Sequence, residues 1–207
     1  MTTFLTADTH FGHASIIRSC NRPFASVAEM DEALIEGWNH VVHDRDVVWH
    51  LGDFAYADEE RTAKIFRALR GTKRLILGNH DLDKKGRVTK ALARLPWDHV
   101  AHAAETKHDG QRIALSHYAG LSWSAQHHGA YQAYGHSHGK LLSLPGSIDV
   151  GVDAQLYRPI AAEEFVVQAD KSVLNAEERL LALSEAILDR TAHYAEHGGA
   201  RFRQGGR

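Results

Sequence analysis

The sequence predicts an α/β domain whose sheet is parallel at least in part, followed by a mostly β half and a C-terminal helix. Three observations predict this class: short apolar runs end in Gly- or Asp-containing turns, amphipathic stretches separate them, and a hairpin signal follows. The length of 207 residues fits one domain, and 43% hydrophobic with 24% charged residues is typical of a globular chain.

In the first half, strands alternate with helices. Ser26 and Glu29 form a capping box, because their side chains can accept hydrogen bonds from the free amides at a helix start. Gly71 ends the second helix. Such alternation is typical of strands that pair in parallel. We expect strands over 4–7, 47–51 and 74–77 and helices over 27–42 and 59–70.

In the second half, Asp109-Gly110 is a strong signal for a β-hairpin, and Asn175 can cap a long amphipathic helix. We expect strands over 99–107, 111–116, 131–134 and 147–152 and a helix over 175–197. The chain then divides into a domain over 1–170, a C-terminal amphipathic helix over 171–198 and a disordered Gly- and Arg-rich tail over 199–207.

Composition excludes several classes of protein. The single cysteine, Cys20, cannot form an internal disulfide, and a formal net charge of −2 gives no pull toward nucleic acid or membranes. The chain shows neither a membrane-spanning apolar run nor a signal peptide, so we expect a cytoplasmic monomer or homodimer. The unusual feature is its 16 histidines, because imidazoles serve as metal ligands and proton carriers.

Side chains that bind metals follow many of the predicted strands. Ligand sites in open α/β sheets form beyond the carboxyl ends of strands, so these side chains can meet in one crevice. Asp-x-His and Gly-Asp are common by chance in this chain, but Gly-Asn-His-Asp is rare and the ordered set is rarer. The residues are Asp8, His10, Asp53, Asn79, His80, His117, His136 and His138.

This order of motifs, D-x-H, G-D, G-N-H-D, a lone H and G-H-x-H, resembles the signature of the calcineurin-like metallophosphoesterases. The stretches DTHFGH at 8–13, NRPF at 21–24 and DVGVD at 149–153 look like a small bacterial and phage branch of uncharacterised phosphoesterases. The resemblance implies a two-layer mixed β-sandwich flanked by helices, a four-layer αββα fold, with two divalent metals at its edge.

The resemblance also implies a ligand set. Asp8, His10, Asp53 and His138 would hold one metal and Asp53, Asn79, His117 and His136 the other, so that Asp53 bridges both. Carboxylate, imidazole and amide donors suit Mn²⁺ first, with Fe, Zn²⁺ or Ni²⁺ as alternatives. Two such ions can activate a hydroxide that attacks phosphorus.

His80 lies beside Asn79 but is not assigned to a metal, so we expect it to protonate the leaving group as general acid. The family often orients this histidine with a carboxylate three residues after the bridging Asp, where this chain has Tyr56. Asp58 and Asp81 are the alternatives, and the sequence leaves this choice open.

Two residues are candidates for contacting the substrate phosphate. His13 follows His10 by three residues and is either such a contact or a surface residue. Arg22 can pair with phosphate through its guanidinium, and a structural ion pair is the competing interpretation, as it is for Arg158. His50 either braces a metal ligand or is an ordinary core histidine.

The sequence therefore predicts a dinuclear metal-dependent phosphoesterase that hydrolyses a phosphodiester, or a phosphomonoester, in a small substrate by attack of a metal-activated hydroxide. Two alternatives stay open: a non-catalytic binding or scaffold protein on the same fold, and a nuclease. Nucleic-acid binding is only weakly indicated. Three arginines of the tail could contact phosphates, but the net charge of −2 does not supply the strong electrostatic attraction that such binding requires; these arginines are Arg201, Arg203 and Arg207. No membrane partner is expected.

Overall fold

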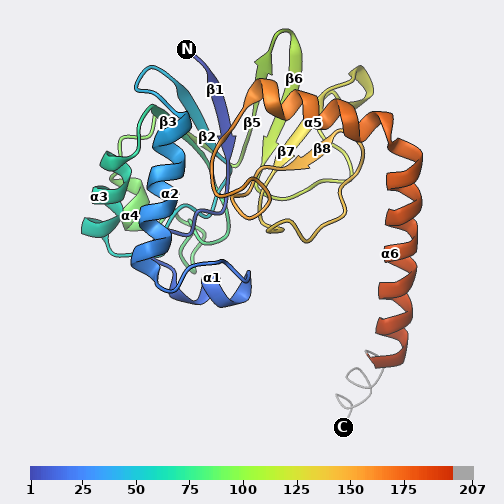
Figure 1. The fold of residues 1–207 in the computed structure, drawn as a ribbon, viewed down its shortest axis with the longest axis horizontal. Helices are drawn as coiled ribbons and strands as arrows, with labels where there is room; N and C mark the ends of the chain where they lie inside the picture. Colours follow the sequence, from blue (N-terminus) through green and yellow to red (C-terminus); the bar gives the residue numbers. More distant parts are fainter. Residues whose placement is uncertain (198–207) are drawn as a thin grey trace.

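The computed structural model describes residues 1–197 and contains two mixed β-sheets flanked by helices, as predicted (Figure 1). The first sheet has the strand order β4-β3-β2-β1-β9. Strands β1 to β4 are parallel to one another, and β9 pairs antiparallel with β1. Its strands are β1 (Thr3–Thr6), β2 (Val47–His50), β3 (Thr72–Ile76), β4 (His99–Ala101) and β9 (Ile160–Ala161).

The second sheet has the strand order β5-β6-β7-β8. Strands β5 and β6 form the antiparallel hairpin that Asp109-Gly110 predicts, whereas β6, β7 and β8 are parallel. Its strands are β5 (Ala103–His108), β6 (Gln111–Ser116), β7 (Tyr131–Tyr134) and β8 (Ser147–Asp149).

The helices begin and end at recognisable signals. At the start of α2, the Ser26 hydroxyl accepts a hydrogen bond from the N–H of Glu29 at 3.1 Å, and the Glu29 carboxylate accepts one from the N–H of Ala25 at 2.7 Å. The Ser26 half of the predicted capping box is therefore confirmed, whereas the Glu29 carboxylate binds the N–H one residue before the cap. The helices are α1 (Ala14–Ser19), α2 (Val27–Val41), α3 (Glu59–Ala68), α4 (Lys90–Ala93), α5 (Ala162–Leu174) and α6 (Ala176–His197), with a 3₁₀ turn, η1, at Gln126–His128.

The apolar core has two parts. One lies between the first sheet and its covering helices, where Phe4 of β1 and Trp38 of α2 are buried. The other lies between the two sheets, where Leu5 of β1, Leu115 of β6 and Phe165 of α5 are buried. Successive side chains of a strand point to opposite faces, so β1 contributes to both parts. This two-sided burial explains why residues of both faces of β1 and β2 are buried.

The segment 99–107 is not one strand, so that prediction was wrong. It divides at His102, where β4 ends in the first sheet and β5 begins in the second. Each half pairs with a different neighbour, β4 with β3 and β5 with β6, and the chain changes sheets between them. Local sequence carries no signal for this change, because both halves have strand-like composition.

The C-terminal region consists of two helices separated at Asn175. Helix α5 packs on strands of both sheets, whereas α6 extends away from them (Figure 1). Leu181 and Leu188 of α6 are 63% and 69% exposed. The division into 1–170 and 171–198 stays a prediction, and the expected tail over 199–207 lies outside the described residues. Within residues 1–197, no helix combines the length and apolarity that crossing a membrane requires.

Candidate metal centre

The metal-type side chains lie in loops that follow strands, as predicted. Asp8 and His10 follow β1, Asp53 follows β2, Asn79 and His80 follow β3, His117 follows β6, and His136 and His138 follow β7. Five of them have a left-handed backbone, with φ of 57° at Asp8, 48° at His10, 59° at Asp53, 65° at His136 and 50° at His138. Non-glycine residues rarely adopt this conformation, and such strain is typical of functional sites.

Two motif glycines allow these loops to approach one another. A Cβ atom added at Gly78 would lie 2.3 Å from Oδ1 of Asp53, and one added at Gly52 would lie 2.5 Å from Nδ1 of His117. Both distances are shorter than any ordinary contact between such atoms. The glycines of G-D and G-N-H-D are therefore required by the close packing of the loops.

Asp53 lies at the middle of the site. Its Oδ1 accepts a hydrogen bond from the N–H of His80 at 2.8 Å, which fixes the carboxylate. Its Oδ2 lies 3.5 Å from Nε2 of His10 and 3.6 Å from Nε2 of His117. One carboxylate oxygen thus lies between two imidazole nitrogens that come from different sheets. This is the position that a bridging ligand requires.

His117 directs a lone pair into the site. Its Nδ1 donates a hydrogen bond to the carbonyl of Leu51 at 2.7 Å, so the neutral ring carries no proton on Nε2. Nε2 lies 3.1 Å from Oδ1 of Asn79 and also faces Asp53. Electron-pair donors that face one another repel unless a cation lies between them. The arrangement therefore fits a metal site.

A second group of donors surrounds His10. Nδ1 of His138 donates to Asp153 at 2.7 Å and leaves Nε2 of the ring available. Among the described residues, Oδ1 of Asp8 and Nε2 of His10 are buried without a hydrogen-bond partner. Buried polar atoms are nearly always paired, so these two atoms fit ligand positions.

The structure brings both predicted ligand groups together. Ligand atoms of Asp8, His10 and His138 lie within 4.8 Å of one another, and so do those of Asp53, His117 and His136. Atoms of His10, Asp53 and His80 also lie within this distance, which places His80 at the centre itself.

Burial and charge shift the pKa of several of these groups. Burial, and then repulsion by Asp53, raises the pKa of Asp8 well above its usual value. Burial, and then the positive charge of His138, lowers the pKa of His10, and burial lowers that of His136. These two imidazoles are therefore neutral at pH 7, which is the form that binds metals. A cation would also relieve the repulsion between the carboxylates.

Asp81 organises the two loops around Asp53. One of its carboxylate oxygens accepts hydrogen bonds from the N–H groups of Asp53 and Gly78, both at 2.8 Å, and the other accepts one from Phe54 at 3.0 Å. Asp81 is fully buried. Its place in G-N-H-D was visible in the sequence, but this bracing role was not.

Asp149 organises the loop that carries His136 and His138 in the same way. It accepts hydrogen bonds from the hydroxyl of Ser137 at 2.6 Å and from the N–H of Gly139 at 2.9 Å. The conspicuous DVGVD stretch was the only signal for this role, and sequence reasoning did not assign one.

Arg22 is buried, so the prediction that it contacts substrate phosphate was wrong. Its guanidinium donates to both carboxylate oxygens of Asp153 at 2.9 and 2.8 Å and to the carbonyls of Thr9 and Asp8 at 3.0 and 2.7 Å. A contact with the sulfur of Met30 at 3.4 Å uses the fifth donor. No donor is left for phosphate, and the competing interpretation of a structural ion pair is confirmed.

Neither alternative carboxylate orients His80. Asp58 caps α3 by accepting a backbone hydrogen bond at 2.8 Å, and Asp81 is occupied by the loops. The neighbours of the His80 ring are aromatic instead: the ring centroids of His13 and Tyr56 lie 5.5 and 6.0 Å away. In this chain Tyr56 therefore lies near the His80 ring, at the sequence position where the resembled family often has a carboxylate.

His13 lies at the rim of the centre. Its Nδ1 is 3.3 Å from Nδ1 of His10, and its ring packs against Tyr56 with centroids 4.6 Å apart. The ring is partly exposed, so it is accessible to a ligand at the metals. Its contact with substrate stays a prediction.

His50 is a core histidine that braces a ligand loop. Its Nε2 donates to the hydroxyl of Thr9 at 2.9 Å, because that hydroxyl in turn donates to the carbonyl of Phe54 at 2.8 Å. Thr9 lies between Asp8 and His10. Burial lowers the pKa of His50 to about 3, so the ring is neutral.

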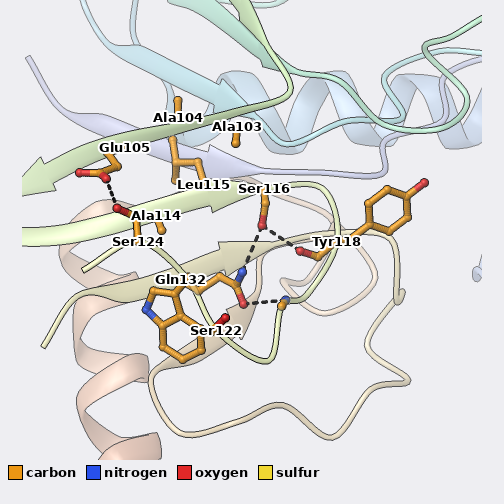
Figure 2. A pocket seen from close by; sticks show the side chains of 12 residues that line it. Ala103, Ala104, Glu105, Ala114, Leu115, Ser116, Tyr118, Ser122, Ser124 and Gln132 are labelled. Carbon is orange, nitrogen blue, oxygen red and sulfur yellow. Dashed lines mark hydrogen bonds between the residues drawn. The ribbon is translucent and has the colours of Figure 1, made fainter. Parts of the chain in front are cut away.

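Two cavities in the structure are of similar size. One, of about 500 Å³, is lined by residues of the second sheet, and Gln132 there donates to Ser116 at 3.2 Å (Figure 2). The ring of Tyr118 points away from this cavity and packs instead on His117, with centroids 4.9 Å apart (Figure 2). The other cavity, of about 460 Å³, is lined by Asn79 and His80 and opens directly beside the centre.

The chain has relatives of matching length. It is 32% identical over 177 residues to the uncharacterised protein MJ1445 of Methanocaldococcus jannaschii, covering 81% of this chain and 91% of that one. It is also 32% identical over 177 residues to the gene 66 protein of Mycobacterium phage D29, covering 73% and 87% of the two chains. No protein-family model matches the chain.

A solved structure supports the fold. The protein of unknown function AQ665 from Aquifex aeolicus is 24% identical, with a TM-score of 0.62 over 81% of this chain and 98% of that one. Relatives at 32% identity share a family with this chain, and its five ordered motifs meet at one edge of two mixed sheets. The chain therefore belongs to one family with MJ1445 and the gene 66 protein of phage D29, and its ordered motifs resemble those of the calcineurin-like metallophosphoesterases.

Proposed function

We propose that the protein is a dinuclear metal-dependent phosphoesterase that hydrolyses a phosphodiester, or a phosphomonoester, in a small substrate. The convergence around Asp53 carries this proposal: one carboxylate oxygen lies 3.5 and 3.6 Å from two imidazole nitrogens of opposite sheets. Carboxylates and unprotonated imidazoles held this close, in a partly buried centre, are a donor set for two cations.

The donors fall into two sets that share Asp53. Asp8, His10, Asp53 and His138 would hold one ion, and Asp53, Asn79, His117 and His136 the other. Mn²⁺ is our first choice because oxygen and imidazole donors are mixed and no thiolate is present, with Fe, Zn²⁺ and Ni²⁺ as alternatives. Bound there, two divalent ions would supply Lewis-acid charge to a phosphoryl group and a nucleophile derived from water.

His80 supplies the remaining chemistry. Its backbone N–H is fixed on Asp53 at 2.8 Å, so the ring stays next to the place where a phosphoryl group would lie. In this proposal the ring donates a proton to the oxygen that leaves phosphorus. His13, whose ring centroid lies 5.5 Å from that of His80, contacts the phosphate or its substituent.

Substitution of Asp53 and His80 separates metal binding from catalysis. In Asp53→Ala, both bound metal and hydrolysis of bis-p-nitrophenyl phosphate with Mn²⁺ should be lost, because both ions lose a ligand. In His80→Ala, metal content should stay near normal while turnover falls about 10²- to 10⁴-fold, with a smaller loss for aryl esters. The exposed His127→Ala serves as control and should change neither.

Metal content by mass spectrometry and turnover are measured together. If His80→Ala removes the metals, His80 is a ligand and its assignment as acid is wrong. If the metal-loaded protein hydrolyses no phosphate ester in a broad panel, the alternative of a binding or scaffold protein on this fold replaces the proposal. Cytoplasmic location and a monomeric or dimeric state stay predictions.

A nuclease remains the second candidate within the same chemistry. Nucleic-acid binding proteins lose affinity steeply as salt rises, because phosphate contacts release counterions. Activity on small esters that is insensitive to salt between 50 and 200 mM would argue against a nuclease. The cavity beside His80 also helps to distinguish a small substrate from a nucleic-acid strand.

A further inference from the structure

The cavity beside His80 has the position of a leaving-group site. It is bounded by the loop after β2, which contributes Tyr56, and by the loop and short helix after β3, which contribute Leu82 and Ala91. Asn79 and His80 form its wall toward the metal centre. If His80 protonates the leaving oxygen, the rest of the leaving group extends from that oxygen into this space.

The size of the cavity selects a substantial group. Its volume is about 460 Å³, whereas roughly 150 Å³ is sufficient for benzene in a protein interior. A methyl or ethyl group would leave most of the space filled with water. A ring-containing alcohol would instead displace this water from apolar side chains.

The lining of the cavity is apolar and aromatic on several sides. Leu82 and Ala91 supply aliphatic surface, and Tyr56 supplies a ring that is 61% exposed although it packs against His13. Exposed aromatic faces stack on planar ligands with centroid separations of about 4.5–7 Å. This lining favours a ring over a flexible polar chain.

The charge of the lining disfavours an anion. Asp58 contributes a carboxylate at the start of α3, and no lysine or arginine lines the cavity in the part of the chain that the structure describes. A leaving group with a second phosphate would meet this negative charge with no lysine or arginine of the lining to pair with. A continuous nucleic-acid strand carries such phosphates on both sides of the scissile bond.

We propose that the Tyr56–Leu82–Ala91 cavity binds the leaving group of the substrate, and that this leaving group is an uncharged, ring-containing alcohol. The inference rests on the proposed phosphoesterase function and names its substrate class: small esters of an aryl or nucleoside-like alcohol, not polynucleotides. Tyr56 and Ala91 are then specificity-determining residues, one as a stacking wall and the other as the floor.

The test fills the cavity and compares two leaving groups. Ala91→Phe places a ring in the cavity, and Ala93→Phe adds the same ring on the exposed side of the same short helix. Methyl p-nitrophenyl phosphate and methyl trifluoroethyl phosphate differ in whether a ring leaves. Ala91→Phe should lower kcat/KM about tenfold or more for the p-nitrophenyl ester only, and Ala93→Phe should lower neither. Equal effects of Ala91→Phe on both esters would overturn the proposal.

A binding measurement tests the leaving-group site separately from the phosphoesterase activity. Phenol, a neutral probe, should show saturation transfer from the metal-free protein and from Ala93→Phe, and much less from Ala91→Phe and Tyr56→Ala. p-Hydroxybenzoate, which adds a negative charge, should bind more weakly than phenol. If the protein hydrolyses no ester but still binds phenol, only the proposed phosphoesterase function is refuted. If Ala91→Phe does not weaken phenol binding, or if p-hydroxybenzoate binds more tightly than phenol, the proposed leaving-group site is refuted.

Discussion

Replacement of Arg22 distinguishes a structural ion pair from a substrate contact. In Arg22→Met, the long apolar stem is kept and the guanidinium, whose side chain is 0% exposed, is lost. Asp153 then keeps His138 as its partner but loses the two donors at 2.9 and 2.8 Å. Removing one partner of a buried pair leaves an uncompensated charge and costs about 3–5 kcal/mol.

A matched control is available at the surface. Arg158 pairs with Glu164 at 3.2 Å, but these side chains are 32% and 40% exposed. Exposed pairs contribute about 0–1 kcal/mol, so Arg158→Met should be nearly neutral. The free energy of unfolding is measured by urea denaturation in the presence of a chelator, so that metal binding does not contribute.

The Arg22–Asp153 pair should also affect metal binding. Asp153 holds Nδ1 of His138, and groups that orient a metal-binding histidine typically change metal affinity about 10- to 100-fold. Arg22→Met should therefore weaken Mn²⁺ binding as well as folding. If stability stays within 1 kcal/mol of the Arg158→Met control while KM for substrate rises, Arg22 binds phosphate after all and the structural assignment is refuted.

Three further predictions concern the buried titratable side chains of the site and its surroundings. Because burial and Asp53 raise the pKa of Asp8, this carboxyl destabilises the metal-free protein increasingly as pH rises above 4. The Asp8→Asn variant should therefore have a higher Tm without metal and a smaller increase of Tm when Mn²⁺ is added. An unchanged increase of Tm with Mn²⁺ would exclude Asp8 as a ligand. The pKa of His50 is lowered to about 3, so at pH 5 the unfolded chain binds a proton at His50 that the folded protein does not bind. Between pH 6.5 and 5, the free energy of unfolding of the wild type should fall by about 2 kcal/mol more than that of His50→Gln. Parallel pH profiles of the two proteins would contradict this. Asp81→Ala leaves three buried N–H groups unpaired and should cost about 3 kcal/mol or more in chemical denaturation, with loss of bound metal; a loss under 1 kcal/mol would mean that water replaces the carboxylate.

Much of the fold could be predicted because local sequence determines it. Residues 131–134 form a strand as predicted, and the Ser26 hydroxyl caps the start of α2 as predicted. The short elements α1 and α4, of six and four residues, carry no such periodic signal. Each buries one apolar residue in the core, Ile16 in α1 and Leu92 in α4, and a local pattern does not encode this tertiary packing.

The candidate centre was also visible in the sequence, because its donors come in short motifs at strand ends. What the motifs could not show is burial. Arg22 and His13 lie near the same motif, yet one is enclosed around Asp153 and the other lies at the rim of the site. A guanidinium has the same chemistry in either place, and only its surroundings decide whether its donors are free.

The sequence by itself determined the resemblance to a family, the order of the strands along the chain, and which residues are the candidate donors, since these depend on residue type and spacing along the chain. The tertiary structure decided which atoms meet: Oδ2 of Asp53 lies between His10 and His117, and Asp81 closes the loops around it. It also decided where the chain changes sheets at His102 and that a cavity adjoins His80. These properties depend on contacts between segments far apart in the chain, and such contacts exist only once the two sheets have packed together.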